Sequence, residues 1–185
     1  MFCAGIERAI KAALAAHEGQ TRKGDEETPY VTHPLHVALI LARWGQASEV
    51  IQAGVLHDVV EDCDGWSVDR VRAEFGDDVA AIVDQLTEDK TRSWEERKRT
   101  GIEHVAHMTP AAAHVKAADK LHNLRSLVAT LRDAPEREAV FARFNGGRDG
   151  TLRVARELVE ALATRLAGEP AAALRAALAE LERLA

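Results

Sequence analysis

A dense group of side chains that could bind a cation lies in the middle of the chain. His57 and Asp58 are adjacent, and Glu61 and Asp62 follow within one helical turn. Apolar residues at positions 51, 55, 56, 59 and 60 predict a helix, on which Asp58 and Asp62 are one turn apart. Carboxylates held this close repel one another unless a cation or a proton neutralises them. The alternative is a solvated acidic helix end, which needs no ligand.

Two further segments supply side chains of the same kinds. His33 precedes a proline, which stiffens the backbone before it and suits the first turn of a helix, so we expect His33 at the lip of a helix. Asp119 lies in an apolar helical stretch one turn before Asn123, and a partly buried aspartate needs a cation or hydrogen-bond donors. Two alternatives stay open: His33 could cap or pack, and Lys116 or Lys120 could neutralise Asp119.

Two imidazoles and two carboxylates form one candidate set of metal ligands: His33, His57, Asp58 and Asp119. A mixed nitrogen and oxygen set suits Mn²⁺, Fe²⁺ or Zn²⁺ better than Mg²⁺ or Ca²⁺, which prefer oxygen alone. Such a site would leave room for water and a phosphate oxygen, lower the pKa of that water and neutralise charge on phosphorus. Glu61 and Asp62 are then placed to orient or deprotonate the water, or to protonate a leaving oxygen.

The composition is that of a helical globular protein. The chain has 185 residues, enough for one substantial core, and aromatic residues make up only 4% of it. Abundant Ala and Leu favour helices over a core built on a sheet. The two cysteines, Cys3 and Cys63, argue against a disulfide framework, and no signal peptide or long apolar span is apparent in the sequence, so we expect a cytoplasmic protein.

The charge distribution narrows the class of partner. The formal net charge of −6 argues against general binding to nucleic acid or to an anionic membrane. Basic residues nevertheless gather in two groups, which form either a solubilising surface or an anion-binding rim. The groups are Arg22 with Lys23, and Lys90, Arg92, Arg97, Lys98 and Arg99. The remaining histidines are expected on the surface or in packing: His17, His36, His104, His107, His114 and His122.

Hydrophobic spacing and helix-breaking residues divide the chain into helices. The expected helices cover residues 2–18, 34–45, 48–63, 67–75, 77–86, 94–107, 110–132, 152–167 and 171–185. Loops are expected at 20–32 and 87–93, and a Gly-rich turn at 145–151 that lacks the features of a P-loop. No segment predicts a strand. One domain is expected over 1–168, with 169–185 as a C-terminal helix packed on it; a homodimer contact is the alternative for that helix.

The order of these segments resembles the HD-domain metal phosphohydrolases, and more narrowly the alarmone hydrolases related to RelA and SpoT. The resemblance covers roughly residues 5–165 and is most specific where a Glu-Asp pair follows His-Asp. The matching segments are Arg22 to Gly24, Pro29 to Leu35, Leu56 to Asp62, Thr87 to Thr91, Glu96 to Arg99 and Ala118 to Leu124.

The resemblance implies an all-α HD-domain bundle of roughly eight to ten helices around a central metal site. It also implies Mn²⁺-dependent removal of the 3′-pyrophosphate of ppGpp or pppGpp, giving GDP or GTP. His33, His57, Asp58 and Asp119 would then be the metal ligands, with Glu61 and Asp62 as the catalytic pair. Arg22 would lie against the base and Lys23 would face phosphate. Asn123 would hold the ribose or phosphate region, with Ser126 as a weaker match.

One departure from the resembling proteins concerns the nucleotide. Small bacterial hydrolases of this kind often carry aromatic residues around 141–155, where this chain keeps Phe141 and Phe144 but has Leu152-Arg153-Val154-Ala155. Base preference is therefore the open part of the prediction. Two alternatives remain: a phosphohydrolase acting on another nucleotide, such as (p)ppApp or NADPH, and a nucleotide-sensing protein with a degenerate site.

Overall fold

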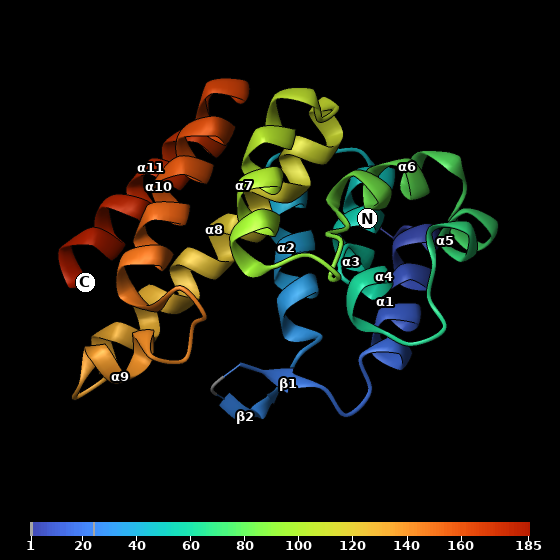
Figure 1. Ribbon diagram of the computed structural model, residues 1–185. Helices are drawn as coiled ribbons and strands as arrows, with labels where there is room; N and C mark the ends of the chain where they lie inside the picture. Colours follow the sequence, from blue (N-terminus) through green and yellow to red (C-terminus); the bar gives the residue numbers. More distant parts are fainter. Residues whose placement is uncertain (1, 24) are drawn as a thin grey trace.

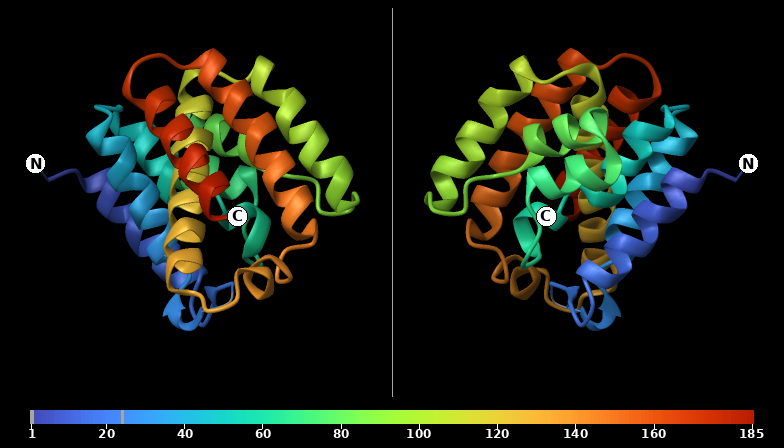
Figure 2. Two further views of the ribbon diagram at one scale, coloured as in Figure 1. Left: turned by 90° about the vertical axis from the view of Figure 1, so that its left-hand side faces the viewer. Right: turned by 90° about the vertical axis from the view of Figure 1, so that its right-hand side faces the viewer.

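The chain folds as helices packed around a central trio, with one small hairpin at its edge (Figures 1 and 2). The computed structural model describes residues 2–23 and 25–185. The first half contains α1 (Ala4–Ala16), β1 (Thr21–Arg22), β2 (Asp25–Pro29), α2 (Thr32–Arg43), α3 (Ser48–Leu56), α4 (Val59–Asp62), α5 (Val68–Phe75) and α6 (Asp77–Leu86). The second half contains α7 (Trp94–His104), η1 (Val105–His107), α8 (Pro110–Asp133), α9 (Arg137–Phe141), α10 (Gly147–Arg165) and α11 (Glu169–Leu184). The predicted all-α fold class is confirmed.

Helices α2, α3 and α8 contact one another and form the centre of the fold. Every residue of α3 from Val50 to Leu56 is buried, which identifies α3 as a helix enclosed on all sides. Helices α1 and α6 cover α3, whereas α10 and α11 cover α8 (Figure 1). The central trio therefore carries the segments that bear His33, His57 and Asp119.

The C-terminal helix α11 is held against the body of the protein by apolar and ionic contacts. Leu174 and Leu181 of α11 are fully buried against the rest of the protein. Glu180, whose side chain is 14% exposed, accepts hydrogen bonds from Arg125 and Arg132 of α8. Within the described part of the chain, no helix combines the length and apolar character that crossing a bilayer requires.

The prediction of a loop without strands at 20–32 is wrong. Strands β1 and β2 pair antiparallel there, with Thr21 opposite Pro29 (Figure 1). The backbone N–H of Tyr30 also donates to the carbonyl of Gln20 at 2.8 Å, which closes the base of the hairpin. The strands are short and polar, so the sequence lacks the apolar alternation that marks a strand.

The prediction of one continuous helix over 48–63 is also wrong. Helix α3 ends at Leu56, and Asp58, at φ −99° and ψ −9°, precedes the short helix α4. The ring Nδ1 of His57 lies 2.9 Å from the carbonyl of Gly54, and this local contact competes with helix continuation. Adjacent side chains of a regular helix point in different directions, but the break lets those of His57 and Asp58 approach each other. The hydrophobic spacing of the sequence does not indicate this break.

Two smaller differences lie in the second half of the chain. Helix α10 begins at Gly147, so most of the expected Gly-rich turn at 145–151 is helical. Helix α9 had no counterpart among the expected helices, because five residues are too few to show a helical period. The remaining helices begin and end close to their expected positions.

Candidate metal centre

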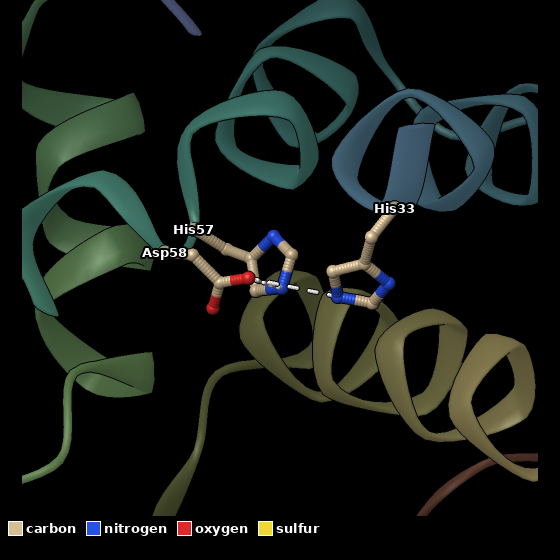
Figure 3. Close-up of side chains that lie close together, drawn as sticks. All are labelled: His33, His57 and Asp58. Carbon is tan, nitrogen blue, oxygen red and sulfur yellow. Dashed lines mark ion pairs between the residues drawn. The ribbon is translucent and has the colours of Figure 1, made fainter. Parts of the chain in front are cut away.

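Three separate segments bring the predicted ligands together. His33 lies in the first turn of α2, as expected of a residue before proline, while His57 and Asp58 occupy the break between α3 and α4. Figure 3 shows the three side chains pointing toward one another. One donor atom from each lies within 4.8 Å of the others. Asp119 reaches the same place from the middle of α8, because its Oδ1 lies 3.3 Å from Nε2 of His33.

The distances between the donor atoms suit a single small cation. Oδ2 of Asp58 lies 3.2 Å from Nε2 of His57 and 3.6 Å from Nε2 of His33. Oδ1 of Asp119 lies 3.9 Å from Nε2 of His57. Ligand atoms about 2.1 Å from one ion are separated by roughly 3 to 3.5 Å at tetrahedral or octahedral angles, so the set is close to the required spacing.

His57 provides the clearest sign that a cation belongs here. Its ring is 6% exposed, and its Nδ1 lies 2.9 Å from the Gly54 carbonyl, which fixes the proton on Nδ1. The opposite nitrogen, Nε2, is buried and has no hydrogen-bond partner among the residues that the structure describes. A buried lone pair without a partner is costly, and it points toward Asp58 and Asp119. The residues therefore fit a divalent transition-metal ion.

Two residues around the ligands were not predicted to act in the site. The hydroxyl of Tyr30 donates to Oδ2 of Asp58 at 2.6 Å, and burial, together with the nearby Asp58 charge, raises the pKa of this phenol, so it remains a donor. Nδ1 of His122 lies 2.8 Å from Nδ1 of His33. Burial, together with His33 and Arg22, lowers the pKa of His122 to about 3, so a neutral His122 accepts the proton of His33.

Both contacts orient a ligand rather than contribute a donor atom, which is a common arrangement around metal sites. His122 had been expected on the surface or in packing, yet it is half-buried beside His33 and its ring lies 4.8 Å from that of His36. Its place three residues after Asp119, on the same helix face, is the signal that could have found it. Tyr30 carries no comparable spacing signal, because it reaches the site from the hairpin side.

The carboxyl of Asp119 is held ionised despite its surroundings. Burial acts to raise its pKa, but the hydrogen bond and charge of His33, followed by His57 and Lys116, hold the pKa well below its usual range. Nδ2 of Asn123 donates to Oδ1 of Asp119 at 2.6 Å. The predicted shared face of Asp119 and Asn123 on one helix is therefore confirmed.

The predicted catalytic pair occupies two different environments. Glu61 accepts a hydrogen bond from the backbone N–H of Glu88 at 3.2 Å, and burial raises its pKa. Asp62 is instead paired with the ammonium group of Lys90, and its carbonyl accepts from Nε2 of Gln20 at 2.9 Å. Glu61 lines the cavity next to the ligands, whereas Asp62 is not among the residues that line it.

Two adjoining cavities open onto the site. The inner cavity, of about 260 Å³, is lined by the four predicted ligands and by Glu61. The outer cavity has a volume of about 750 Å³. Residues lining both include Arg22, Tyr30, Arg97, Lys98, Lys120 and Asn123. The acidic ligand cluster is therefore faced by cations across a space large enough for a phosphorylated small molecule.

The predicted substrate-binding residues all line the outer cavity. The guanidinium of Arg22 donates to Oδ1 of Asn123 at 3.2 Å and lies 5.6 Å from the centre of the Tyr30 ring. The ammonium of Lys23 lies 5.4 Å from the centre of the Phe144 ring. Ser126 lines the same cavity one turn further along α8.

Part of the second basic group also faces the cavities. Glu88, whose side chain is 15% exposed, lies 3.0 Å from Lys98, 3.3 Å from Arg97 and 3.9 Å from Lys116. One carboxylate among three cations leaves a positive surplus beside the inner cavity. Arg92 pairs instead with Asp89 away from the site, so the group is divided between an anion-binding rim and ordinary surface.

Comparison with known proteins agrees with this geometry. The family model described as the HD domain matches residues 9–152. The chain belongs to the HD-domain family. The resemblance drawn from the motifs is thus confirmed.

Individual HD-domain relatives extend the likeness over most of the chain. This chain is 45% identical over 124 residues to guanosine-3′,5′-bis(diphosphate) 3′-pyrophosphohydrolase MESH1 of Xenopus tropicalis. The match covers 66% of this chain and 69% of that protein. The Homo sapiens MESH1 protein is 43% identical over 126 residues, covering 67% and 70%. Among solved structures, a metazoan ortholog of SpoT that hydrolyses ppGpp has a TM-score of 0.80 at 34% identity, covering 99% of this chain and 96% of that one.

Proposed function

We propose that this protein is a metal-dependent pyrophosphohydrolase that removes the 3′-pyrophosphate of ppGpp or pppGpp, giving GDP or GTP. The observation that carries the proposal is the buried, unpartnered Nε2 of His57 beside Asp58 and Asp119, facing a cavity rimmed with cations. The names of the relatives at 43–45% identity supply the substrate class. We place the reaction in the cytoplasm, with a nucleotide as substrate and no nucleic acid or membrane partner.

His33, His57, Asp58 and Asp119 would hold the metal, for which we propose Mn²⁺ because the set mixes imidazole and carboxylate. When bound, the ion supplies Lewis acidity, which neutralises charge on phosphate oxygens and lowers the pKa of water. Tyr30 and His122 keep Asp58 and His33 in place through bonds of 2.6 Å and 2.8 Å.

The reaction adds one water across the bond between the ribose 3′ oxygen and phosphorus. The water oxygen bonds to phosphorus, the bond to O3′ breaks, and O3′ leaves with a proton. We assign Glu61 as the base that accepts the proton from water, because it lines the inner cavity and its raised pKa favours proton uptake. Asp62, the other member of the proposed pair, lies beside it in a salt bridge with Lys90.

The substrate would lie across both cavities. Its 3′-pyrophosphate would occupy the inner cavity, where Lys98, Arg97 and Lys120 supply positive charge. The nucleoside would occupy the outer cavity, with Arg22 against the base, Lys23 near phosphate, and Asn123 and Ser126 along the ribose side.

The test uses protein stripped of metal and incubated with ppGpp, with and without added Mn²⁺. We expect GDP and pyrophosphate only when Mn²⁺ is present, resolved by anion-exchange chromatography. A panel containing ppApp and NADPH distinguishes the alternatives. Turnover of one of these without turnover of ppGpp would overturn the substrate, whereas tight nucleotide binding with no turnover of any member would favour a sensing protein.

A further inference from the structure

Trp94 forms part of the wall of the outer cavity. The residue is half-buried at the start of α7. Among the described residues, no aromatic ring, cation or hydrogen-bond partner is found for its indole, although the other aromatic residues of this cavity are engaged. Tyr30 donates to Asp58, and Lys23 lies over Phe144. An unpartnered indole in a partly polar cavity is available to a ligand.

The fold holds this indole in a defined place. Ser93 and Glu96 form a reciprocal capping box at the start of α7, which fixes the backbone that carries Trp94. The next residue, Glu95, accepts from Arg153 of α10 at 2.7 Å and ties the two helices together. The position of the ring is therefore set by its own helix and by α10.

A slot made of two glycines receives the ring on the α10 side. A Cβ at Gly146 would lie 2.4 Å from Cη2 of Trp94, and a Cβ at Gly150 would lie 3.3 Å from the same atom. The first distance is prohibitive, so a glycine is required at position 146 for the ring to occupy its place. The Gly-rich segment 145–151 thus provides the space that the Trp94 ring occupies.

We propose that Trp94 is the stacking surface for the nucleobase of a purine nucleotide in the outer cavity, and so a residue that binds the base rather than the phosphates. Cations that bind phosphate and an aromatic face that binds a base line the same 750 Å³ space. This chain lacks aromatic residues over 152–155, and Trp94 supplies an aromatic surface from α7 against the first turn of α10. The assignment rests on the proposed function for its substrate class.

The test measures binding rather than turnover. Isothermal titration gives the affinity of the metal-loaded protein for GDP and for inorganic pyrophosphate, which has no base. Stacking of one base contributes about 1–3 kcal/mol, so Trp94→Leu should weaken GDP binding by about 5- to 150-fold. Pyrophosphate affinity should stay unchanged. Trp66→Leu is the matched control, because Trp66 stacks on Arg70 and Phe75 and lines neither cavity.

A second variant moves the ring without removing it. Gly146 has φ −86° and ψ 0°, which alanine also adopts, so Gly146→Ala should act mainly by displacing the indole. We expect it to weaken GDP binding in the parent protein but to add little in the Trp94→Leu background. Unchanged GDP affinity in Trp94→Leu, or an equal loss for GDP and pyrophosphate, would overturn the stacking role. Failure to hydrolyse ppGpp with intact Trp94-dependent GDP binding would instead reject only the proposed function.

Discussion

Neighbouring carboxylates in this site differ in what surrounds them rather than in chemical type. Glu61 meets a backbone N–H and the inner cavity, whereas Asp62 meets the ammonium of Lys90. Burial raises the pKa of Glu61, while the carboxylate of Asp62 lies in a salt bridge with Lys90. This difference is why we propose Glu61, rather than Asp62, as the base, and the proposal can be tested one residue at a time.

The first prediction separates catalysis from metal binding. Glu61→Gln should retain the metal but lower kcat at least about 100-fold, because a general base typically contributes that factor or more. Asp58→Ala should lose both metal and activity. Mass spectrometry measures the metal content of each variant, and chromatography of the products measures kcat. A Glu61→Gln variant with parental kcat would show that Glu61 is not the base, and Asp62→Asn is then the variant to compare.

The pH profile tests the same assignment. A base must be deprotonated to act, so activity should fall as the pH drops through the raised pKa of Glu61. The acid limb of kcat should therefore lie above the range of an ordinary glutamate, whose pKa is about 4.3. The limb should disappear in the residual activity of Glu61→Gln. An acid limb that survives this substitution unchanged would belong to another group.

Tyr30 offers a prediction about an outer contact. Tyr30→Phe removes one oxygen and its 2.6 Å hydrogen bond to Asp58 while keeping the ring. Loss of such a contact typically weakens metal binding about 10- to 100-fold. Titration of metal-free protein with Mn²⁺ measures this directly, and Tyr30→Phe with parental affinity would show that the hydroxyl does not orient Asp58.

At the scale of elements, the site depends on how closely α2 and α3 approach. A Cβ at Gly54 would lie 2.4 Å from Cδ1 of the fully buried Leu41, so a larger residue at position 54 would have to displace this side chain or the helix that carries it. The two helices carry His33 and His57 at their adjoining ends. Their separation thus sets the distance between two of the proposed ligands.

Gly54→Ala should therefore weaken both the fold and the metal site. Overpacking costs about 1–3 kcal/mol, and the better helix propensity of alanine returns about 1 kcal/mol, so we expect a net loss of up to about 2 kcal/mol. Chemical denaturation measures the free energy of unfolding, and calorimetry measures Mn²⁺ affinity. Gly101→Ala in α7 is the matched control for the unfolding measurement, because its Cβ would meet only Glu88 at 3.7 Å. If Gly54→Ala and Gly101→Ala have the same free energy of unfolding, then α2 shifts away from α3 without loss of stability.

The elements also show where sequence reasoning succeeds and where it ends. A long helix such as α8 has enough regularly spaced apolar residues for its ends to be predicted within a residue or two. The prediction that Asp119 and Asn123 share one face followed from that helix. The break at Asp58 and the hairpin that delivers Tyr30 depend on contacts between distant parts of the chain. No local pattern encodes those contacts, so the roles suggested here for Tyr30 and Trp94 had to await the fold.

On the scale of the whole molecule, the proposed ligands join segments far apart in the chain. His33, His57 and Asp119 come from three helices or their ends, so an ion bound among them ties the central trio together. An ion that binds only the folded state stabilises it by about 2.7 kcal/mol at one hundred times its Kd. For a protein of this size that corresponds to roughly 5–10 °C in Tm.

Removal of metal should therefore lower the Tm by about that amount. Differential scanning calorimetry of the protein with Mn²⁺ and after treatment with a chelator measures the change. Asp58→Ala is the control, since its Tm should not respond to Mn²⁺ or to the chelator. If the Tm of the parent protein changes neither with Mn²⁺ nor with the chelator, the folded protein does not bind metal at the proposed ligands.

A chain of hydrogen bonds connects the proposed nucleotide-binding residue Arg22 to the proposed metal ligand Asp119. Arg22 donates to Asn123, and Asn123 donates to Oδ1 of Asp119, over 3.2 Å and 2.6 Å. A nucleotide that draws Arg22 toward itself would alter how Asn123 holds this carboxylate, and so we expect it to alter the affinity for the ion. Thermodynamic reciprocity then requires the ion to change the affinity for the nucleotide by the same factor. In a cell, the fraction of this protein carrying metal would follow the nucleotide concentration as well as the supply of metal.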